Sequence, residues 1–152
     1  MSFTQVELAE MIATHAHRGV LDKVGVPYIE HPRWIVTMIG DQFPNLQAAA
    51  WLHDVVEDTK YTLDDLRTLG VLEEIVQDVD ALTKRPGETR KDTIRRVKTR
   101  PGALHIKKFD NAHNSSTYRV QLLPKDKQAR LVAKYERDRY WLYTDEADWD
   151  DR

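Results

Sequence analysis

The chain has 152 residues with no cysteine, 41% hydrophobic and 32% charged residues, and a formal net charge of −2. This composition is typical of one globular domain and excludes disulfides, thiol nucleophiles and zinc–thiolate sites. The charge balance argues against a broadly basic nucleic-acid binder, and no apolar run approaches the length of a membrane span.

The N-terminal residues, MSFTQVELAE, lack the basic and apolar regions of a signal peptide, so we expect a cytoplasmic protein. Helical periodicity follows along almost the whole sequence. The predicted helices cover residues 3–19, 31–40, 44–59, 62–70, 71–84, 89–99, 103–115 and 125–143. No strand-like alternation and no internal repeat is visible. The sequence therefore predicts an all-α fold, one compact helical bundle over residues 1–143 with an acidic, flexible tail at 144–152.

Glycine, proline and capping residues set the predicted boundaries. Gly25 and Pro27 predict a loop between the first two helices. Asn45 is a candidate N-cap for the third helix, and Thr62 followed by Asp65 is close to a capping box for the fourth. The last helix is rich in aromatic residues; we interpret it as core, with a homodimer interface as the alternative.

Residues 52–59, LHDVVEDT, place four ionisable side chains after an apolar, alanine-rich approach. On a helix His53 and Asp54 are about 100° apart, and Glu57 and Asp58 follow four residues later on nearly the same faces. Buried charges are tolerated mainly where they pair or bind a metal. The octapeptide is therefore either the mouth of a site or the solvated face of an amphipathic helix.

Two other segments favour the site. PYIEHP puts His31 at the start of a helix, and IKKFDNAHNS puts Asp110 in an otherwise apolar helix with Asn114 one turn later. With His53 and Asp54 these residues would form a mixed nitrogen and oxygen ligand set. Such a set suits Mn²⁺, Fe²⁺, Zn²⁺ or Co²⁺ better than Ca²⁺.

A strongly basic stretch follows between residues 84 and 108, where ten lysines and arginines face only two acidic residues. A charge run of this kind is usually a solvated face. Beside an acidic metal site, however, it would suit a polyphosphate substrate.

The motifs stand in a recognisable order: AHRG at 16–19, PYIEHP at 27–32, WLHDVVEDT at 51–59, LGVLEEIVQDVDALTK at 69–84 and IKKFDNAHN at 106–114. In this order and spacing the chain resembles the HD superfamily of metal-dependent phosphohydrolases. Within that superfamily it is similar to the hydrolase domain of RelA/SpoT homologues and to small alarmone hydrolases. The resemblance covers roughly residues 10–120.

The resemblance implies roles for individual residues. It implies one divalent ion, Mn²⁺ by the family's preference, held by His31, His53, Asp54 and Asp110. Glu57 and Asp58 would be catalytic, serving the attacking water and positioning the phosphate. Asn114 and Lys23 would bind the nucleotide.

Two positions depart from the family pattern. Asp22 stands where the family has an arginine that helps hold guanine, and Asn111 replaces another basic residue. Arg18, Lys84, Arg90 and Lys91 are candidates for replacement substrate contacts.

The predicted function is metal-dependent hydrolysis of the 3′-pyrophosphate of (p)ppGpp, giving GDP or GTP and pyrophosphate. The expected partner is an anionic nucleotide, with no nucleic acid and no membrane. Asp22 and Asn111 keep open an HD phosphohydrolase that acts on another nucleotide, such as a 5′-nucleotide or a phosphorylated dinucleotide. A third hypothesis, of a different class, is a non-catalytic HD-fold binding protein.

Overall fold

Helices supply nearly all the regular structure in the computed structural model, which describes residues 2–150. They are α1 Gln5–Ala16, α2 Glu30–Ile39, α3 Pro44–Leu52, α4 Val55–Asp58, α5 Leu63–Thr68, α6 Glu73–Leu82, α7 Arg90–Val97, α8 Pro101–Asn114, α9 Thr117–Val120, α10 Lys125–Tyr143 and the 3-10 helix η1 Glu146–Asp148. Over the described residues the only β pairing is an isolated bridge between Leu21 and Pro27. The predicted all-α class is confirmed.

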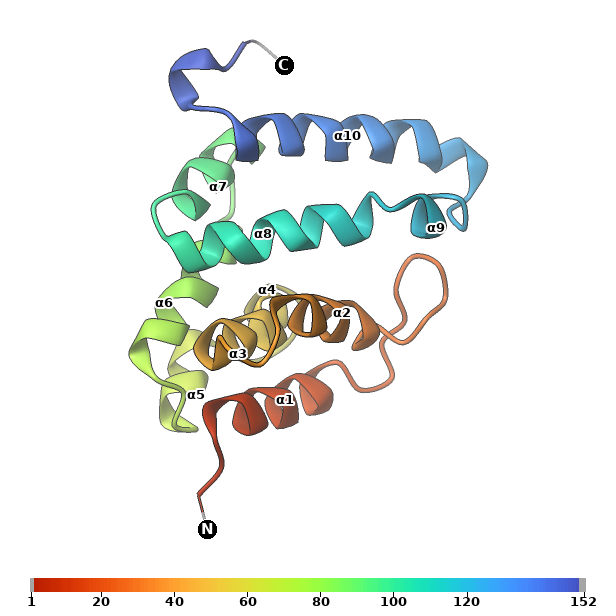
Figure 1. Cartoon of the computed structure of the whole chain (residues 1–152). Helices are drawn as coiled ribbons and strands as arrows, with labels where there is room; N and C mark the ends of the chain where they lie inside the picture. The colour runs from red at the N-terminus through yellow and green to blue at the C-terminus, as the bar shows by residue number, and fades with distance from the viewer. Residues whose placement is uncertain (1, 151–152) are drawn as a thin grey trace.

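The helices stack in layers from α1, through α2 and α3, to α8 and then α10 (Figure 1). At the centre, α3 is buried from Gln47 to its end, with Ala48, Ala49, Ala50 and Leu52 fully inaccessible. Small alanine side chains let α1 and α2 approach α3 closely, and the close contact leaves little unfilled space. The alanine-rich run of the sequence therefore builds the centre of the core.

The last helix is held by smaller apolar clusters. Trp141 and Leu142 pack with Ile94 of α7, and Tyr135 packs with Leu123. The interpretation of the aromatic last helix as core is confirmed, while the homodimer stays a prediction. Between these clusters the surfaces of α7, α8 and α10 that face one another carry polar side chains.

One predicted helix is broken at His53 and Asp54, two of the candidate metal ligands. The sequence predicted a single helix over residues 44–59, but α3 ends at Leu52 and α4 begins at Val55. His53 and Asp54 form the turn between them, and the His53 ring bonds to the carbonyl oxygen of Ala50. A side chain that bonds the preceding turn competes with the helical ladder, which explains the interruption.

Of two predicted helix N-caps, one is confirmed and one is wrong. The capping box of Thr62 and Asp65 is confirmed at the start of α5. Asn45 is not an N-cap, because α3 begins one residue earlier with Pro44, a residue suited to a first helical position.

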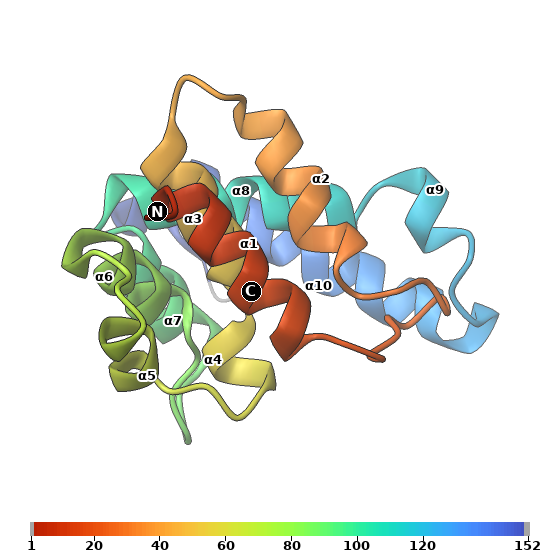
Figure 2. The same cartoon turned by 90° about the horizontal axis from the view of Figure 1, so that it is seen from below.

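The loop over residues 17–29 lies on the same side of the molecule as α9 and the start of α10 (Figures 1 and 2). An ion pair joins them: Arg119 Nη1 of α9 lies 3.0 Å from Asp22 Oδ2 of the loop. Segments almost a hundred residues apart in sequence therefore form one wall.

The acidic C-terminal segment makes contacts as far as residue 150. Trp149 packs against the cluster that contains Trp141, Glu146 pairs with Arg95, and Lys98 donates to the carbonyl oxygen of Thr144. The flexibility predicted for residues 144–152 stays a prediction, and residues 151 and 152 lie outside the described part. Among the described residues no helix is both long and apolar enough to cross a membrane.

Candidate active site

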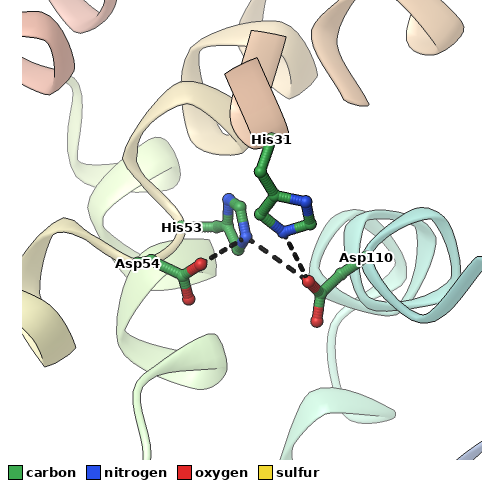
Figure 3. Close-up of side chains that lie close together, drawn as sticks. All are labelled: His31, His53, Asp54 and Asp110. Atoms are coloured by element: carbon green, nitrogen blue, oxygen red, sulfur yellow. Dashed lines mark hydrogen bonds and ion pairs between the residues drawn. The ribbon is translucent and has the colours of Figure 1, made fainter. Parts of the chain in front are cut away.

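Four side chains converge where α2, the α3–α4 turn and α8 meet. His31 comes from the first turn of α2, His53 and Asp54 from the turn, and Asp110 from α8 (Figure 3). One ligand atom from each lies within 4.8 Å of all the others. Both imidazoles and Asp110 are buried and Asp54 is half-buried, so the cluster lies inside the protein.

The tautomer of His53 makes this cluster a site for a positive charge. Its Nδ1 donates to the carbonyl oxygen of Ala50 at 2.7 Å, so in the neutral ring Nε2 carries the lone pair. That Nε2 lies 2.9 Å from Asp54 Oδ2 and 3.7 Å from Asp110 Oδ1, and it is buried without a hydrogen-bond partner among the described residues. A lone pair facing two carboxylates requires a proton or a cation between them.

The protonation preferences lead to the same conclusion. Burial alone would lower the pKa of His53, but the charges of Asp54 and Asp110 raise that pKa well above its ordinary value. Burial alone would raise the pKa of Asp54, but the facing His53 lowers it to about 2. Both carboxylates therefore stay ionised, the form in which they bind metals.

Asp110 is held by neighbours on its own helix. Lys107 Nζ lies 3.0 Å from its Oδ2, and Asn114 Nδ2 donates to its Oδ1 at 3.0 Å. Against the effect of burial, Lys107 and the two histidines hold the pKa of Asp110 well below its usual range. His31 Nε2 lies 2.8 Å from the same Oδ1.

Further side chains orient the ligands from behind. The hydroxyl of Tyr28 donates to Asp54 Oδ2. The Nδ1 atoms of His31 and His113 lie 2.6 Å apart, and burial lowers the pKa of His113 to about 4, so the His113 ring is neutral. The other ring nitrogen of His31, Nε2, faces the cluster. His113 in turn stacks on Trp34, with centroids 4.5 Å apart.

A cavity of about 410 Å³ opens beside the cluster. Its wall includes His31, Asp54 and Asp110, together with the loop 20–24, the end of α8 and part of α10. Val20, Leu21, Val24 and Leu123 give the end beyond the ligands an apolar lining. The volume and the mixed lining are those of a small-molecule site with a few orienting polar groups.

Glu57 and Asp58 line this cavity from α4, both at its open side. The backbone N–H of Lys84 donates to Glu57 Oε1 at 2.8 Å. Partial burial and the charges of Asp54 and Glu57 raise the pKa of Asp58 to about 6. A carboxyl group with this pKa can exchange a proton near neutral pH.

The expected substrate contacts are distributed unequally. Lys23 and Asn114 line the cavity, Lys84 and Arg90 line the adjoining hollow beside Glu57, and Lys91 lines neither. The structure does not bring Arg18 to the site: it lines a separate hollow on α1. His17 is buried, at 4% exposed, whereas the neighbouring Arg18 is exposed to solvent.

The two departures from the family pattern have structural partners here. Asp22 Oδ1 accepts from the backbone N–H groups of Val24 and Val26, each at 2.9 Å, while its Oδ2 pairs with Arg119. The guanidinium missing from position 22 is thus matched by one that reaches the same cavity wall from α9. Asn111 is buried and donates to the carbonyl oxygen of Tyr135.

Among the residues that contact the ligands or line the cavity, sequence reasoning missed Tyr28, Lys107 and Arg119. Tyr28 and Lys107 lie inside the quoted motifs, and Lys107 stands three residues before Asp110, a spacing that pairs side chains on a helix. Arg119 lies outside every motif, and no local signal connects it to Asp22.

Comparisons with known proteins find relatives in sequence and in fold. No family model matches the chain. A GTP pyrophosphokinase of Streptomyces coelicolor is 38% identical over 136 residues, which cover 83% of this chain and 16% of that protein. A guanosine-3′,5′-bis(diphosphate) 3′-pyrophosphohydrolase of Haemophilus influenzae is 35% identical over 134 residues, which cover 80% of this chain and 20% of that protein. The chain thus spans only a small part of these relatives.

A solved structure shares the fold. It is described as a metazoan orthologue of SpoT that hydrolyses ppGpp and plays a role in starvation responses. Its TM-score is 0.76 at 20% sequence identity, and the match covers 94% of this chain and 88% of that one.

Proposed function

We propose that this chain, which is related to part of the RelA/SpoT-type proteins and shares the fold of the metazoan SpoT orthologue, is a metal-dependent phosphohydrolase. The proposed reaction is hydrolysis of the 3′-pyrophosphate of guanosine alarmones, converting ppGpp or pppGpp to GDP or GTP and pyrophosphate. The observation that carries the proposal is the cluster at the cavity, where His53 Nε2 faces two ionised carboxylates and His31 Nε2 lies beside one of them.

His31, His53, Asp54 and Asp110 fit a divalent ion by the chemistry of their atoms. Two imidazole nitrogens and two carboxylate oxygens favour first-row transition ions over Ca²⁺, and we propose one Mn²⁺. When bound, the ion supplies Lewis-acid polarisation of a phosphate group and lowers the pKa of a water molecule.

The protein's own groups would then orient the substrate and move the proton. The ammonium of Lys23 and the side chain of Asn114 line the cavity where a nucleotide would bind. Glu57, fixed by the backbone N–H of Lys84, would orient the attacking water. Asp58, with its pKa raised to about 6, is ionised at neutral pH and still basic enough to accept a proton.

In the proposed reaction the water oxygen adds to the phosphorus that is bonded to the ribose 3′ oxygen. The bond between that phosphorus and the 3′ oxygen breaks, and pyrophosphate separates from the nucleotide. One proton of the water passes to Asp58, and the 3′ oxygen leaves as a hydroxyl group after taking up a proton. Atoms and charge balance as ppGpp plus water giving GDP plus pyrophosphate.

One observation favours a second candidate, an HD phosphohydrolase acting on a different nucleotide. The cavity wall carries the Asp22–Arg119 pair where the resembled family has a single arginine that helps hold guanine. This exchange alters the hydrogen-bonding groups presented to a nucleobase while leaving the four metal-ligand candidates in place.

Product analysis separates the two functions. Metal-stripped protein reloaded with Mn²⁺ should release GDP and pyrophosphate in equal amounts from ppGpp, resolved by anion exchange. Asp54→Asn, which keeps the shape of the side chain, should release neither. The second candidate is correct if the protein, folded and loaded with Mn²⁺, leaves ppGpp intact but cleaves another nucleotide of a panel.

A further inference from the structure

A second hollow, of about 260 Å³, adjoins the cavity between α7, α8 and α10. The two share part of their walls, including Asp110, Asn114 and Lys134, so Lys134 stands where the hollow and the cavity meet. Four cationic side chains line the hollow, namely Lys84, Arg90, Lys107 and Lys134, together with the carboxylates Glu57, Asp110 and Asp138. It thus begins at the metal-ligand candidate Asp110 and extends away from the loop that contains Asp22.

The charges in this hollow are not all matched. Arg90 pairs with the buried Asp138, and Lys107 pairs with Asp110. Lys134 is half-buried on α10 and has no hydrogen bond or ion pair to a carboxylate among the described residues. Its Nζ lies over the ring of Tyr135, 6.0 Å from the ring centroid.

An ammonium group in such a place is unfavourable for the free protein. Burial removes water from Lys134, and the neighbouring charges of Arg90 and Lys23 act in the same direction, so its pKa is lowered. A half-buried charge kept without a partner destabilises the fold unless a ligand of opposite sign completes the site. The tetrahedral oxygens of a phosphate group match the donors that lysine and arginine offer.

We propose that the hollow between α7, α8 and α10 is a second phosphate subsite, with Lys134 as the group that binds the anion. This inference rests on the proposed function and deepens it: the substrate carries two separate phosphate groups, one beside the metal ligands and one beside Lys134. The occupant is either the diphosphate remote from the bond that breaks or the pyrophosphate that is released.

The first test measures binding of inorganic pyrophosphate to the metal-free protein by isothermal titration calorimetry. Lys134→Gln should weaken binding about tenfold, the effect expected for loss of one charge-assisted contact. Lys134→Arg should restore most of the affinity. Lys127→Gln is the matched control, because Lys127 is exposed two turns earlier on α10 and lines neither hollow.

Thermal unfolding distinguishes a ligand-binding lysine from a structural one. If Lys134 serves the ligand, Lys134→Gln leaves the Tm of the free protein unchanged or raises it, and reduces the increase in Tm caused by pyrophosphate. The proposal is overturned if wild type does not bind pyrophosphate, or if Lys134→Gln binds it as tightly as Lys127→Gln.

Kinetics then identify the occupant. If the remote diphosphate occupies the hollow, Lys134→Gln raises KM for ppGpp but not for a guanosine nucleotide that carries only the 3′-pyrophosphate. If the released pyrophosphate occupies it, the variant raises the inhibition constant of pyrophosphate and leaves both KM values unchanged. Because the binding test needs no turnover, failure of the proposed hydrolysis and failure of this subsite give different results.

Discussion

At the scale of single residues, the site depends on how each ring and carboxylate is fixed before any ligand arrives. The Ala50 carbonyl sets the tautomer of His53, and His113 sets the orientation of His31. Such outer hydrogen bonds direct the ligating atom and raise its affinity for a metal. Because each imidazole is positioned from behind, few conformations remain to be lost when a cation binds.

Asp58 gives a prediction about activity and pH. Its pKa of about 6 means that the carboxylate is protonated, and unable to accept a proton, in more acidic solution. We expect kcat/KM to rise as the pH increases through that value and then to level off. Asp58→Asn should lower kcat by about 10²–10⁴. Asp126→Asn, an exposed change on α10, serves as the control, and an unchanged pH profile in Asp58→Asn would remove Asp58 from the mechanism.

Asp58 also gives a prediction about how the stability of the metal-free protein depends on pH. Because folding raises the pKa of Asp58 from 3.8 to about 6, its ionised form destabilises the metal-free fold above the higher value. Asp58→Asn should therefore raise Tm at pH 8, and the gain should shrink as the pH is lowered to 5. Calorimetric scans of both proteins across this range check the sign; a gain that grows toward pH 5 would contradict it.

At the scale of elements, the alanine-rich α3 and the turn that follows it explain how the ligands reach the interior. The sequence revealed the motif order and therefore the four ligand candidates, but it predicted an unbroken helix through His53 and Asp54. The break depends on a side-chain bond to Ala50, which helical periodicity does not detect. Lys107, by contrast, could have been found from its spacing to Asp110.

Ala49 tests the close packing of α3. It is fully buried in the core, where α1 and α2 pack on α3, and a larger side chain has no space there. Ala49→Leu should destabilise the protein by about 1–3 kcal/mol through overpacking, measured by urea unfolding. Ala129→Leu, at an exposed position of α10, should change stability little. Equal stability of the two variants would contradict the packing described here.

At the scale of the whole molecule, the cavity is closed by segments that are distant in sequence. The loop over residues 17–29 and α9 meet through Asp22 and Arg119, and α10 supplies the far wall through Lys134 and Tyr135. The sequence could not indicate these partners, because a pairing across 97 residues depends on the final fold. Local motifs therefore identified the proposed metal ligands and two residues of the cavity wall, Lys23 and Asn114. Tertiary structure was needed to find Arg119, Lys134 and Tyr135 in the same wall.

Arg119 gives a prediction at this scale. The side chains of Asp22 and Arg119 are 5% and 14% exposed, so Arg119→Gln leaves a buried carboxylate without its ion-pair partner. We expect a loss of about 3 kcal/mol in the free energy of unfolding. Asp22→Asn combined with Arg119→Gln should recover part of that loss in a double-mutant cycle. Arg130→Gln, an exposed change on α10, is the control, and an equal effect of Arg119→Gln and Arg130→Gln would show that the pair does not hold the wall.

We propose that phosphohydrolysis by this chain depends on one divalent ion held by His31, His53, Asp54 and Asp110. The most direct measurement determines bound Mn²⁺ by mass spectrometry and pyrophosphate release from ppGpp on the same samples, for wild type, Asp110→Asn and the control Asp126→Asn. We expect one ion per chain and full turnover in wild type and control. Asp110→Asn should lose at least about tenfold in metal affinity, and its turnover should fall with the metal content. Turnover in metal-free protein, or full metal content in Asp110→Asn, would contradict the account.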